Sequence, residues 1–292
     1  LFILGLFFSF SSTSFIADER LNKDYYFFFQ KHLLYAFVSF SLMIVISLFD
    51  TSLLNKILLP IFLVFFITMI LVPFFGIEVK GAKRWLNFYI FRFQPIEFIK
   101  PFFILIVAQI ISSHWIKNLN LSYFLSFVLL SAIILLLVLQ PDLGQSVLLA
   151  CAWISIIFIS GFNIYLLFLL LGFITLVLSA LIYFLPERFS YIISRVTSFF
   201  DPEKSGNFQT SRATEAIREG SLKGQGVGEG ILKESVPEAH TDYVIAVISE
   251  EFGSIISILI ISIFLFIAFR VIKRIINLNN NFYKLALSGL IS

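Results

Sequence analysis

The chain is poor in the residues that build disulfides, metal centres and strongly charged surfaces. It contains one cysteine, Cys151, and three histidines, His32, His114 and His240, which lie far apart in the sequence. A single cysteine excludes an intramolecular disulfide and any metal site with several cysteine ligands. The spacing of the histidines suggests no zinc site, and a formal net charge of +3 is too small to indicate nucleic-acid binding.

Charged residues make up only 13% of the 292 residues, whereas 59% are hydrophobic. Soluble domains carry about a quarter charged residues, so no soluble fold could bury this much apolar surface and the lipid bilayer must be the solvent. The chain begins without a methionine inside an apolar run, and another apolar run starts just before Ser292. We therefore expect a fragment that lacks part of the first membrane span and everything after the start of a ninth.

The apolar runs predict an all-α fold, a polytopic membrane helical bundle that forms a single domain over residues 1–292. A spanning helix needs about 20 mostly apolar residues. The fourth run must begin near Pro95 to be long enough, and proline suits the first helical position. This start places Glu97 and Lys100 one turn apart on one helix face, and Pro101 is expected to kink the helix. The expected transmembrane helices cover 1–17, 33–49, 53–75, 95–113, 122–139, 146–161, 163–185 and 243–269, and a ninth starts near Phe282.

Two connections are long, residues 76–94 and residues 186–242. Each follows an odd-numbered helix, so both lie on the same side of the membrane. Counting Lys and Arg in the loops places that side in the cytoplasm. Cations that bind a phosphate-bearing substrate would mislead this count, so charge alone leaves the orientation open.

A basic cluster in and after the first long loop could bind phosphate. Lys and Arg are the usual phosphate donors, and Trp85 could lie at the membrane interface. The alternative is a basic loop that touches anionic lipid head groups. This alternative does not account for Glu97, because a loop that only anchors to the membrane surface does not require a carboxylate between two cations near or inside the span. The cluster comprises Lys80, Lys83, Arg84, Arg92, Glu97 and Lys100.

Two further segments have both structural and functional interpretations. Gln140-Pro-Asp-Leu-Gly144 suits a tight helix–helix turn, although Asp142 could instead shape a polar cavity. Glycines at 220, 224, 226, 228 and 230 do not match a nucleotide-binding P-loop. They predict either a flexible loop or backbone that packs closely around a ligand.

The segment 230–253 is the strongest functional candidate, because it places acids where a loop meets an apolar helix. Asp242 could be an N-cap, as could Thr241, or it could be a general base that takes a proton from a sugar hydroxyl. Glu234 could position substrate or help hold a divalent ion. His240 is expected to be structural rather than catalytic. Glu250 and Glu251 are expected inside the span, where they stabilise the helix bundle through buried partners.

Together these segments resemble the SEDS family of polytopic membrane proteins, the FtsW/RodA/SpoVE group. The resemblance covers essentially the whole chain, and the motifs occur in the family's order. Glycines in 226–230 followed by Pro-Glu-Ala-His-Thr-Asp resemble the FtsW branch, of alphaproteobacterial type, more than the RodA branch. Ile96 and Glu219-Gly220-Ser221 depart from the family pattern without removing a charged group of the motifs. The matching motifs are Gly81-Ala-Lys-Arg-Trp85, Gln94-Pro-Ile-Glu97 with Lys100, Gln140-Pro-Asp-Leu-Gly144, Val236-Pro-Glu-Ala-His-Thr-Asp242 and Glu250-Glu-Phe-Gly253.

The resemblance implies a ten-helix bundle whose catalytic face, with both long loops, lies outside the cytoplasmic membrane. It implies a peptidoglycan glycosyltransferase that polymerises lipid II and releases undecaprenyl diphosphate, with Asp242 as the general base. A divalent cation, Mg²⁺ or Mn²⁺, would offset charge on the leaving group, with no protein ligands assignable. The implied substrate-binding residues are Arg84, Arg92, Glu97, Lys100, Glu234 and His240, and Gln94, Asp142, Glu250 and Glu251 are implied to support the cavity.

The resemblance also implies partners and a location. The partners are a class B penicillin-binding protein, an FtsI-like transpeptidase, and the division complex, and the location is the inner membrane at the septum. Three alternatives stay open. The first is a lipid II flippase, the second is an elongation polymerase of the RodA type, and the third is a non-enzymatic scaffold that activates a partner synthase.

Overall fold

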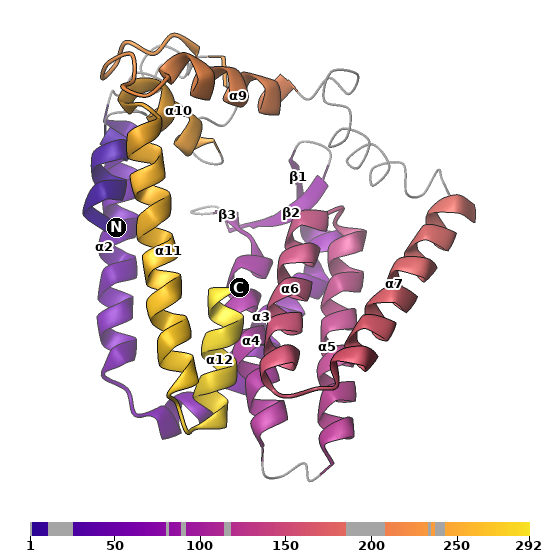
Figure 1. Ribbon diagram of the computed structural model, residues 1–292. Helices are drawn as coiled ribbons and strands as arrows, with labels where there is room; N and C mark the ends of the chain where they lie inside the picture. The colour runs from indigo at the N-terminus through magenta and orange to yellow at the C-terminus, as the bar shows by residue number, and fades with distance from the viewer. Residues whose placement is uncertain are drawn as a thin grey trace. The chain divides into compact units, whose positions relative to one another are not determined.

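The computed structural model describes residues 2–10, 26–79, 82–88, 92–113, 118–184, 208–232, 235–236 and 243–292. Almost all of these residues are helical (Figure 1). The chain divides into two compact units. One comprises Leu1–Phe49 with Ser194–Ile267, and the other comprises Asp50–Ile193 with Ala268–Ser292.

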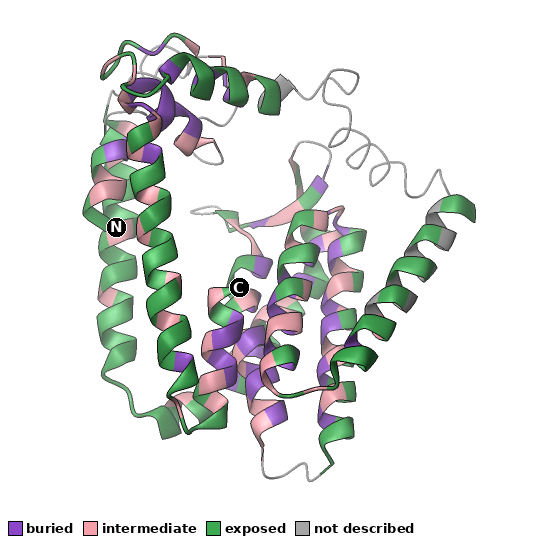
Figure 2. Ribbon diagram, in the orientation of Figure 1, coloured by how far each residue is buried: buried purple, intermediate pink, exposed green. Residues whose placement is uncertain are grey.

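The second unit is a helical bundle around α4. Its helices are α3 (Thr51–Phe75), α4 (Pro95–Ser112), α5 (Leu119–Leu139), α6 (Leu143–Ile159), α7 (Ile164–Phe184) and α12 (Asn281–Ile291). Helix α4 packs against α3, α5, α6 and α12, and Ile99, Phe103 and Val107 on it have no exposed surface. Figure 2 shows buried residues gathered on the faces that these helices turn to one another. The start of α4 is therefore held in the middle of this unit.

A small antiparallel sheet lies between α3 and α4, where the sequence predicted only a loop. Its strands are β1 (Ile77–Val79), β2 (Ala82–Asn87) and β3 (Arg92–Phe93), in the order β1-β2-β3. Alternation along β2 turns Leu86 toward the protein and Lys83 toward solvent. Strands this short, with several charged residues, carry too weak a hydrophobic alternation to be recognised in the sequence.

The first unit contains helical residues 2–10, α2 (Phe27–Ser47), α9 (Phe208–Gly220), α10 (Val244–Phe252) and most of α11 (Ser254–Ile276). Residues 2–10 pack on α10, since the rings of Phe7 and Phe8 lie 5.8 and 5.3 Å from that of Phe252. The small residues Ala213 and Ala216 of α9 are buried against Val247 of α10, so α9 and α10 approach closely.

The predicted span 243–269 is wrong, because the helix breaks at Gly253. That residue has φ +85°, which ends α10 and lets α11 start at Ser254. A Cβ on Gly253 would lie 2.3 Å from the backbone oxygen of Leu222. Only glycine combines this φ with such close backbone contact, so the apolar run contains two helices instead of one.

Among the described residues, five helices are long and apolar enough to cross a bilayer. They are Phe29–Ser47, Thr51–Phe75, Pro95–Ser112, Leu119–Leu139 and Ser254–Ile276. Half of the α4 window is buried, compared with 6% of the α11 window and none of α2. The exposed apolar surface of α2 and α11 is therefore the surface that a bilayer would cover.

Replacing Gly220 by alanine tests the contact between α9 and α10. A Cβ there would lie 1.9 Å from the backbone oxygen of Ser249, so α10 must shift. We expect Gly220→Ala to lower the free energy of unfolding by about 1–3 kcal/mol, the range for overpacked sites. The measurement is thermal unfolding of the purified protein in detergent.

Gly172→Ala in α7 is the matched control, since nothing lies within 4 Å of its added Cβ. Alanine favours a helix over glycine by up to about 1 kcal/mol, so its Tm should stay the same or rise. Equal Tm values for the two variants would contradict the close packing at Gly220.

Candidate functional site

An ion pair at the start of α4 is the first part of the candidate site. Pro95 occupies the first turn, and Gln94 is the N-cap residue, although its side chain does not cap the helix. The Lys100 ammonium Nζ lies 2.7 Å from Oε2 of Glu97, one turn earlier. The predicted positions of these two residues on one helix face are thus confirmed. The Lys100 side chain is 19% exposed and that of Glu97 is 47% exposed, so the pair borders both the bundle and its surroundings.

Gln145 of α6 completes this cluster, and the sequence interpretation missed it. Its Nε2 donates a hydrogen bond of 2.9 Å to Oε1 of Glu97. The two carboxylate oxygens of Glu97 therefore have different donors, Gln145 and Lys100. A signal was present, because Gln145 follows Asp142 by three residues, the spacing of a capping box.

Arg84 of β2 fastens the turn between α5 and α6. Its Nε donates to the backbone oxygen of Gln140 at 3.2 Å, and Nη2 donates to the backbone oxygen of Pro141. Its Nε also lies 3.7 Å from Oδ2 of Asp142. The guanidinium is thus directed at the protein, and the structure provides a structural role for Arg84 where diphosphate binding was predicted.

Asp142 has the turn role that the sequence indicated. It is the N-cap of α6, and its Oδ1 accepts from the backbone amide of Gln145 at 3.5 Å. The neighbouring Gln140 is buried and donates from Nε2 to the backbone oxygen of Met69 in α3 at 3.2 Å. The segment Gln140–Gln145 therefore connects α3, α4 and β2 through polar side chains.

Arg92 lies on the opposite face of the sheet from Arg84. In the β2–β3 pairing Arg92 is opposite Asn87, and directly paired residues share a face. Arg84 lies an odd number of residues from Asn87, so the two arginines point to different sides. Arg92 is exposed, whereas Arg84 is partly covered. Arg92, unlike Arg84, is thus available to an external phosphate group, and so is the partly exposed Lys100.

In the other unit, Glu250 and Glu251 are buried acids whose carboxylates accept backbone hydrogen bonds. Oε1 of Glu250 accepts from the amide of Leu232 at 2.7 Å, and Oε1 of Glu251 accepts from that of Gly228 at 3.3 Å. Both residues are at most 1% exposed. The prediction of buried partners is confirmed, but the partners belong to the glycine-containing loop. Both residues lie in α10, which precedes the candidate span Ser254–Ile276, so their predicted depth in the membrane stays a prediction.

The glycine-containing loop packs closely against the end of α10, so its glycines have a structural role. The backbone amides of Gln225 and Gly226 donate to the backbone carbonyl oxygens of Glu250 and Glu251 at 2.9 and 3.1 Å, respectively. A Cβ on Gly230 would lie 2.8 Å from Cδ of Glu250. The glycines are therefore needed for close approach to the end of α10.

Three predicted site residues, Glu234, His240 and Asp242, lie outside the described residues. The structure assigns the N-cap of α10 to Tyr243, not to Asp242 or Thr241 as the capping interpretation proposed. The catalytic prediction for Asp242 stays a prediction.

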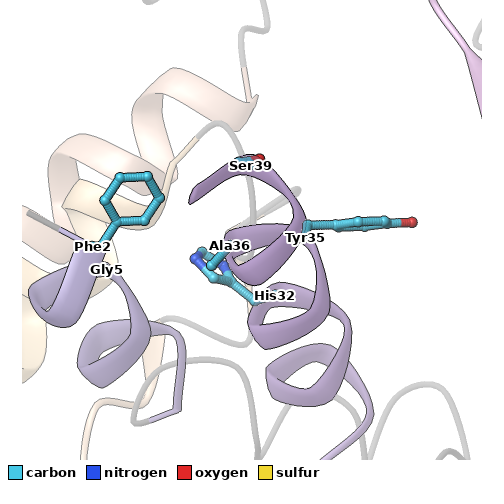
Figure 3. Close-up of a pocket in the computed structure, with 6 residues that line it drawn as sticks. All are labelled: Phe2, Gly5, His32, Tyr35, Ala36 and Ser39. Carbon is cyan, nitrogen blue, oxygen red and sulfur yellow. The ribbon is translucent and has the colours of Figure 1, made fainter. Parts of the chain in front are cut away.

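A separate pocket of about 460 Å³ lies between residues 2–10 and α2 (Figure 3). Its lining surface is mostly apolar, with His32 and Tyr35 as its titratable side chains, and it contains none of the predicted site residues. In the part of the chain that the structure describes, no three His, Cys, Asp or Glu side chains gather to hold a metal ion.

Substituting Arg84 tests whether it fastens the α5–α6 turn. Hydrogen bonds that involve a charged group contribute about 1.5–3 kcal/mol, so Arg84→Ala should lower the free energy of unfolding by about that amount. Asp142→Asn retains a capping oxygen and should cost less, about 0.5–1 kcal/mol, as expected for a partly exposed ion pair. The measurement is thermal unfolding in detergent.

Lys83→Ala provides the control, because Lys83 is the exposed neighbour of Arg84 on β2. Its Tm should match that of the unchanged protein. If Arg84→Ala unfolded at the same temperature as Lys83→Ala, the clamp on the turn would be ruled out.

Comparison with known proteins gives a match along the whole sequence. Residues 1–292 match the FTSW_RODA_SPOVE family, described as "Cell cycle protein". The chain is 33% identical over 291 residues to the "Probable peptidoglycan glycosyltransferase FtsW" of Caulobacter vibrioides, which covers 98% of this chain and 73% of that protein.

Two solved structures share the fold at low sequence identity. One comes from work described as "Structural coordination of polymerization and crosslinking by a peptidoglycan synthase complex". It has a TM-score of 0.79 and 19% identity, and covers 99% of this chain and 80% of that one. The other is the rod shape determining protein RodA of Thermus thermophilus, with a TM-score of 0.67 and 19% identity over 99% and 78% of the two chains. The predicted helical membrane fold is thereby confirmed, and the chain belongs to the FtsW/RodA/SpoVE family of membrane proteins, the SEDS family.

Proposed function

We propose that this chain is a peptidoglycan glycosyltransferase of the FtsW type, which polymerises lipid II into glycan strands for septal wall synthesis. The family match along the whole chain supports the class, and the name of the Caulobacter relative supports the reaction. In the structure, the observation that carries the proposal is the Lys100–Glu97–Gln145 cluster at the start of the central helix α4.

The cluster suits a diphosphate bound from outside the bundle. Glu97 shares its charge between Lys100 and Gln145, so Lys100 is not its sole donor. An ammonium has three donors, and the bond to Glu97 uses one of them. Lys100 can therefore contact a phosphate oxygen while staying paired, and the exposed Arg92 adds a second positive charge on β3.

The reaction joins two lipid-linked sugars. Asp242 takes the proton from a hydroxyl of the acceptor disaccharide, whose oxygen then attacks the anomeric carbon of the donor. The bond between that carbon and the diphosphate breaks, and undecaprenyl diphosphate leaves with the electron pair. Lys100 and Arg92 stabilise the developing negative charge. Glu234 and His240 belong to the proposed substrate-binding residues, as the motif match implies.

A divalent cation, Mg²⁺ or Mn²⁺, belongs to the proposal as a companion of the diphosphate, whose charge it would offset. The described residues do not form a site for it, because no three potential ligands gather there. The substrate's phosphate oxygens would hold the ion, and Glu234, outside the described residues, would help to hold it.

The partner is a class B penicillin-binding protein within the division complex, and the location is the inner membrane at the septum. Support comes from the solved relative described as part of a complex that coordinates polymerisation and crosslinking. The RodA-type elongation polymerase remains the alternative within the family, since the Thermus protein shares the fold as well.

A flippase and a scaffold are the alternatives outside this reaction. A flippase needs its main charges near the middle of the membrane. The Glu97–Lys100 pair instead lies in the first two turns of α4, at the end joined to the sheet. This position favours chemistry at one membrane surface over transport through it.

Asp242→Asn tests the catalytic assignment. The full-length protein, purified with its cognate penicillin-binding protein, is given lipid II and Mg²⁺ or Mn²⁺, and glycan polymer is measured on gels. Loss of a general base lowers rates by about 10²–10⁴-fold, so polymer should become undetectable. Glu215→Gln, which changes an exposed carboxylate of α9, should polymerise normally.

A wild-type rate from Asp242→Asn would refute the general-base role and favour the scaffold. If the unchanged protein moved lipid II across vesicles but made no polymer, the flippase would be the better assignment.

Gln145→Leu tests whether Gln145 keeps Lys100 available to the substrate. Without its donor, Glu97 binds Lys100 alone, so KM for lipid II should rise about fivefold, equivalent to one hydrogen bond of about 1 kcal/mol. Lys100→Met should raise KM more, by about 10–100-fold, because a charged contact is lost. The same Gln→Leu change at Gln109, further along α4, should leave KM unaltered. Equal KM values for Gln145→Leu and Gln109→Leu would show that Gln145 does not contribute to substrate binding.

A further inference from the structure

The glycine-containing loop presents three large aliphatic side chains that the protein leaves uncovered. Leu222 is 63% exposed, Val227 is 63% exposed and Ile231 is 75% exposed. They lie on a short loop whose backbone is held firmly to α10 by the amides of Gln225 and Gly226. The loop backbone is thus held in place by hydrogen bonds, although these three aliphatic side chains are not buried in a hydrophobic core. Exposed apolar patches of this kind mark sites of interaction.

The loop is tied to the first residue of a candidate membrane span. The backbone amide of Ser254 donates to the backbone oxygen of Ser221 at 2.9 Å, and Oγ of Ser254 donates to the same oxygen at 2.6 Å. Ser254 is the first residue of α11, the candidate span. Leu222, the neighbour of Ser221, therefore lies at the level where this span begins.

The length of α11 places that level at the membrane boundary. From Ser254 to Phe269 the helix has no charged residue, and these ~16 residues rise ~24 Å at 1.5 Å each. Arg270 follows, then Lys273 and Arg274. A hydrocarbon core of about 30 Å needs about 20 residues. Even when Arg270 extends its charge toward the surface and the apolar span reaches Ile272, the rise is only ~28 Å. Ser254 therefore lies at or inside the boundary of the hydrocarbon core.

We propose that residues 221–231 dock onto the lipid surface of the bilayer through Leu222, Val227 and Ile231. The aliphatic side chains enter the layer between head groups and acyl chains, as interfacial apolar residues do. Lys223 beside Leu222 can extend to lipid phosphates, and the loop's acid, Glu229, faces water or head groups. The apolar surface of α11, with Ile255 and Ile258 exposed, continues this lipid-facing surface below the loop.

This docking does not depend on the proposed reaction, because it concerns how α10 and its loop are held at the surface. A partner protein that covered the same three side chains would be a different arrangement, and the following experiment separates the two.

Fluorescence quenching in bilayers tests the proposal. The full-length protein, with Cys151→Ser to remove the single cysteine, receives one cysteine at Leu222, Val227 or Ile231, and an environment-sensitive NBD label is attached. The protein is placed without partners in phosphatidylcholine–phosphatidylglycerol vesicles. Labels at Ile258, on the exposed face of α11, and at Glu215, on the exposed face of α9, serve as the lipid and water references.

We expect the three loop labels to be quenched by lipids that carry a nitroxide at acyl carbon 5. Their quenching by aqueous iodide should be at least about threefold weaker than at Glu215, consistent with insertion of about 5–10 Å. Iodide quenching equal to that at Glu215 would overturn the proposal. Protection from both quenchers would also overturn it, because the protein itself would then cover the loop. Iodide access that disappears only after a penicillin-binding protein is added would assign the surface to that partner instead.

A second variant keeps the test independent of labelling at the aliphatic positions. The label is placed at Lys223, and Leu222, Val227 and Ile231 are all changed to serine. These side chains are exposed, so the Tm in detergent should be unchanged. Lipid quenching at position 223 should be lost in the serine variant, and if it persists, these three side chains do not hold the loop at the membrane.

Discussion

Polar groups among apolar helices must find partners within the protein, because neither the bundle interior nor lipid supplies any. This constraint explains the polar contacts in both units. The carboxylates of Glu250 and Glu251 receive loop amides, and Gln140 reaches a backbone oxygen of α3. Arg84 satisfies the carbonyls of the α5–α6 turn. Each contact joins segments that are distant in the sequence, so the same bonds that satisfy polar groups also determine which helix ends lie together.

Much of the fold was predictable from the sequence because spanning helices need long apolar runs. Pro95 marked the start of α4, and its position placed Glu97 and Lys100 correctly. The three-stranded sheet was not predictable, because its strands are too short to show alternation. The break at Gly253 was hidden inside an apolar run, since its cause is the backbone of a loop about 30 residues earlier in the chain.

The candidate site was predictable where neighbours in the sequence determine the geometry and not where the tertiary fold does. The Glu97–Lys100 pair follows from helical spacing alone. The sequence grouped Arg84 with Arg92, yet strand pairing turns them to opposite faces. Gln145 was missed because its partner lies on another helix, 48 residues away. Hydrogen bonding to the turn gives Arg84 a structural role, which depends on contacts with a segment more than 50 residues away in the sequence.

The loop that closes around Gly253 also has a consequence for biogenesis. The residues of this loop are synthesised before α10 and α11. Its contacts join residues that are close in the sequence, such as Leu232 with Glu250 and Ser221 with Ser254. Local contacts form fast, and bonds such as Gln225 to Glu250 replace those that the helix loses at its break. The loop 220–232 and helix α10 are therefore suited to fold as one cooperative piece while α11 inserts. Amide groups on both sides of the break would be protected together and open together.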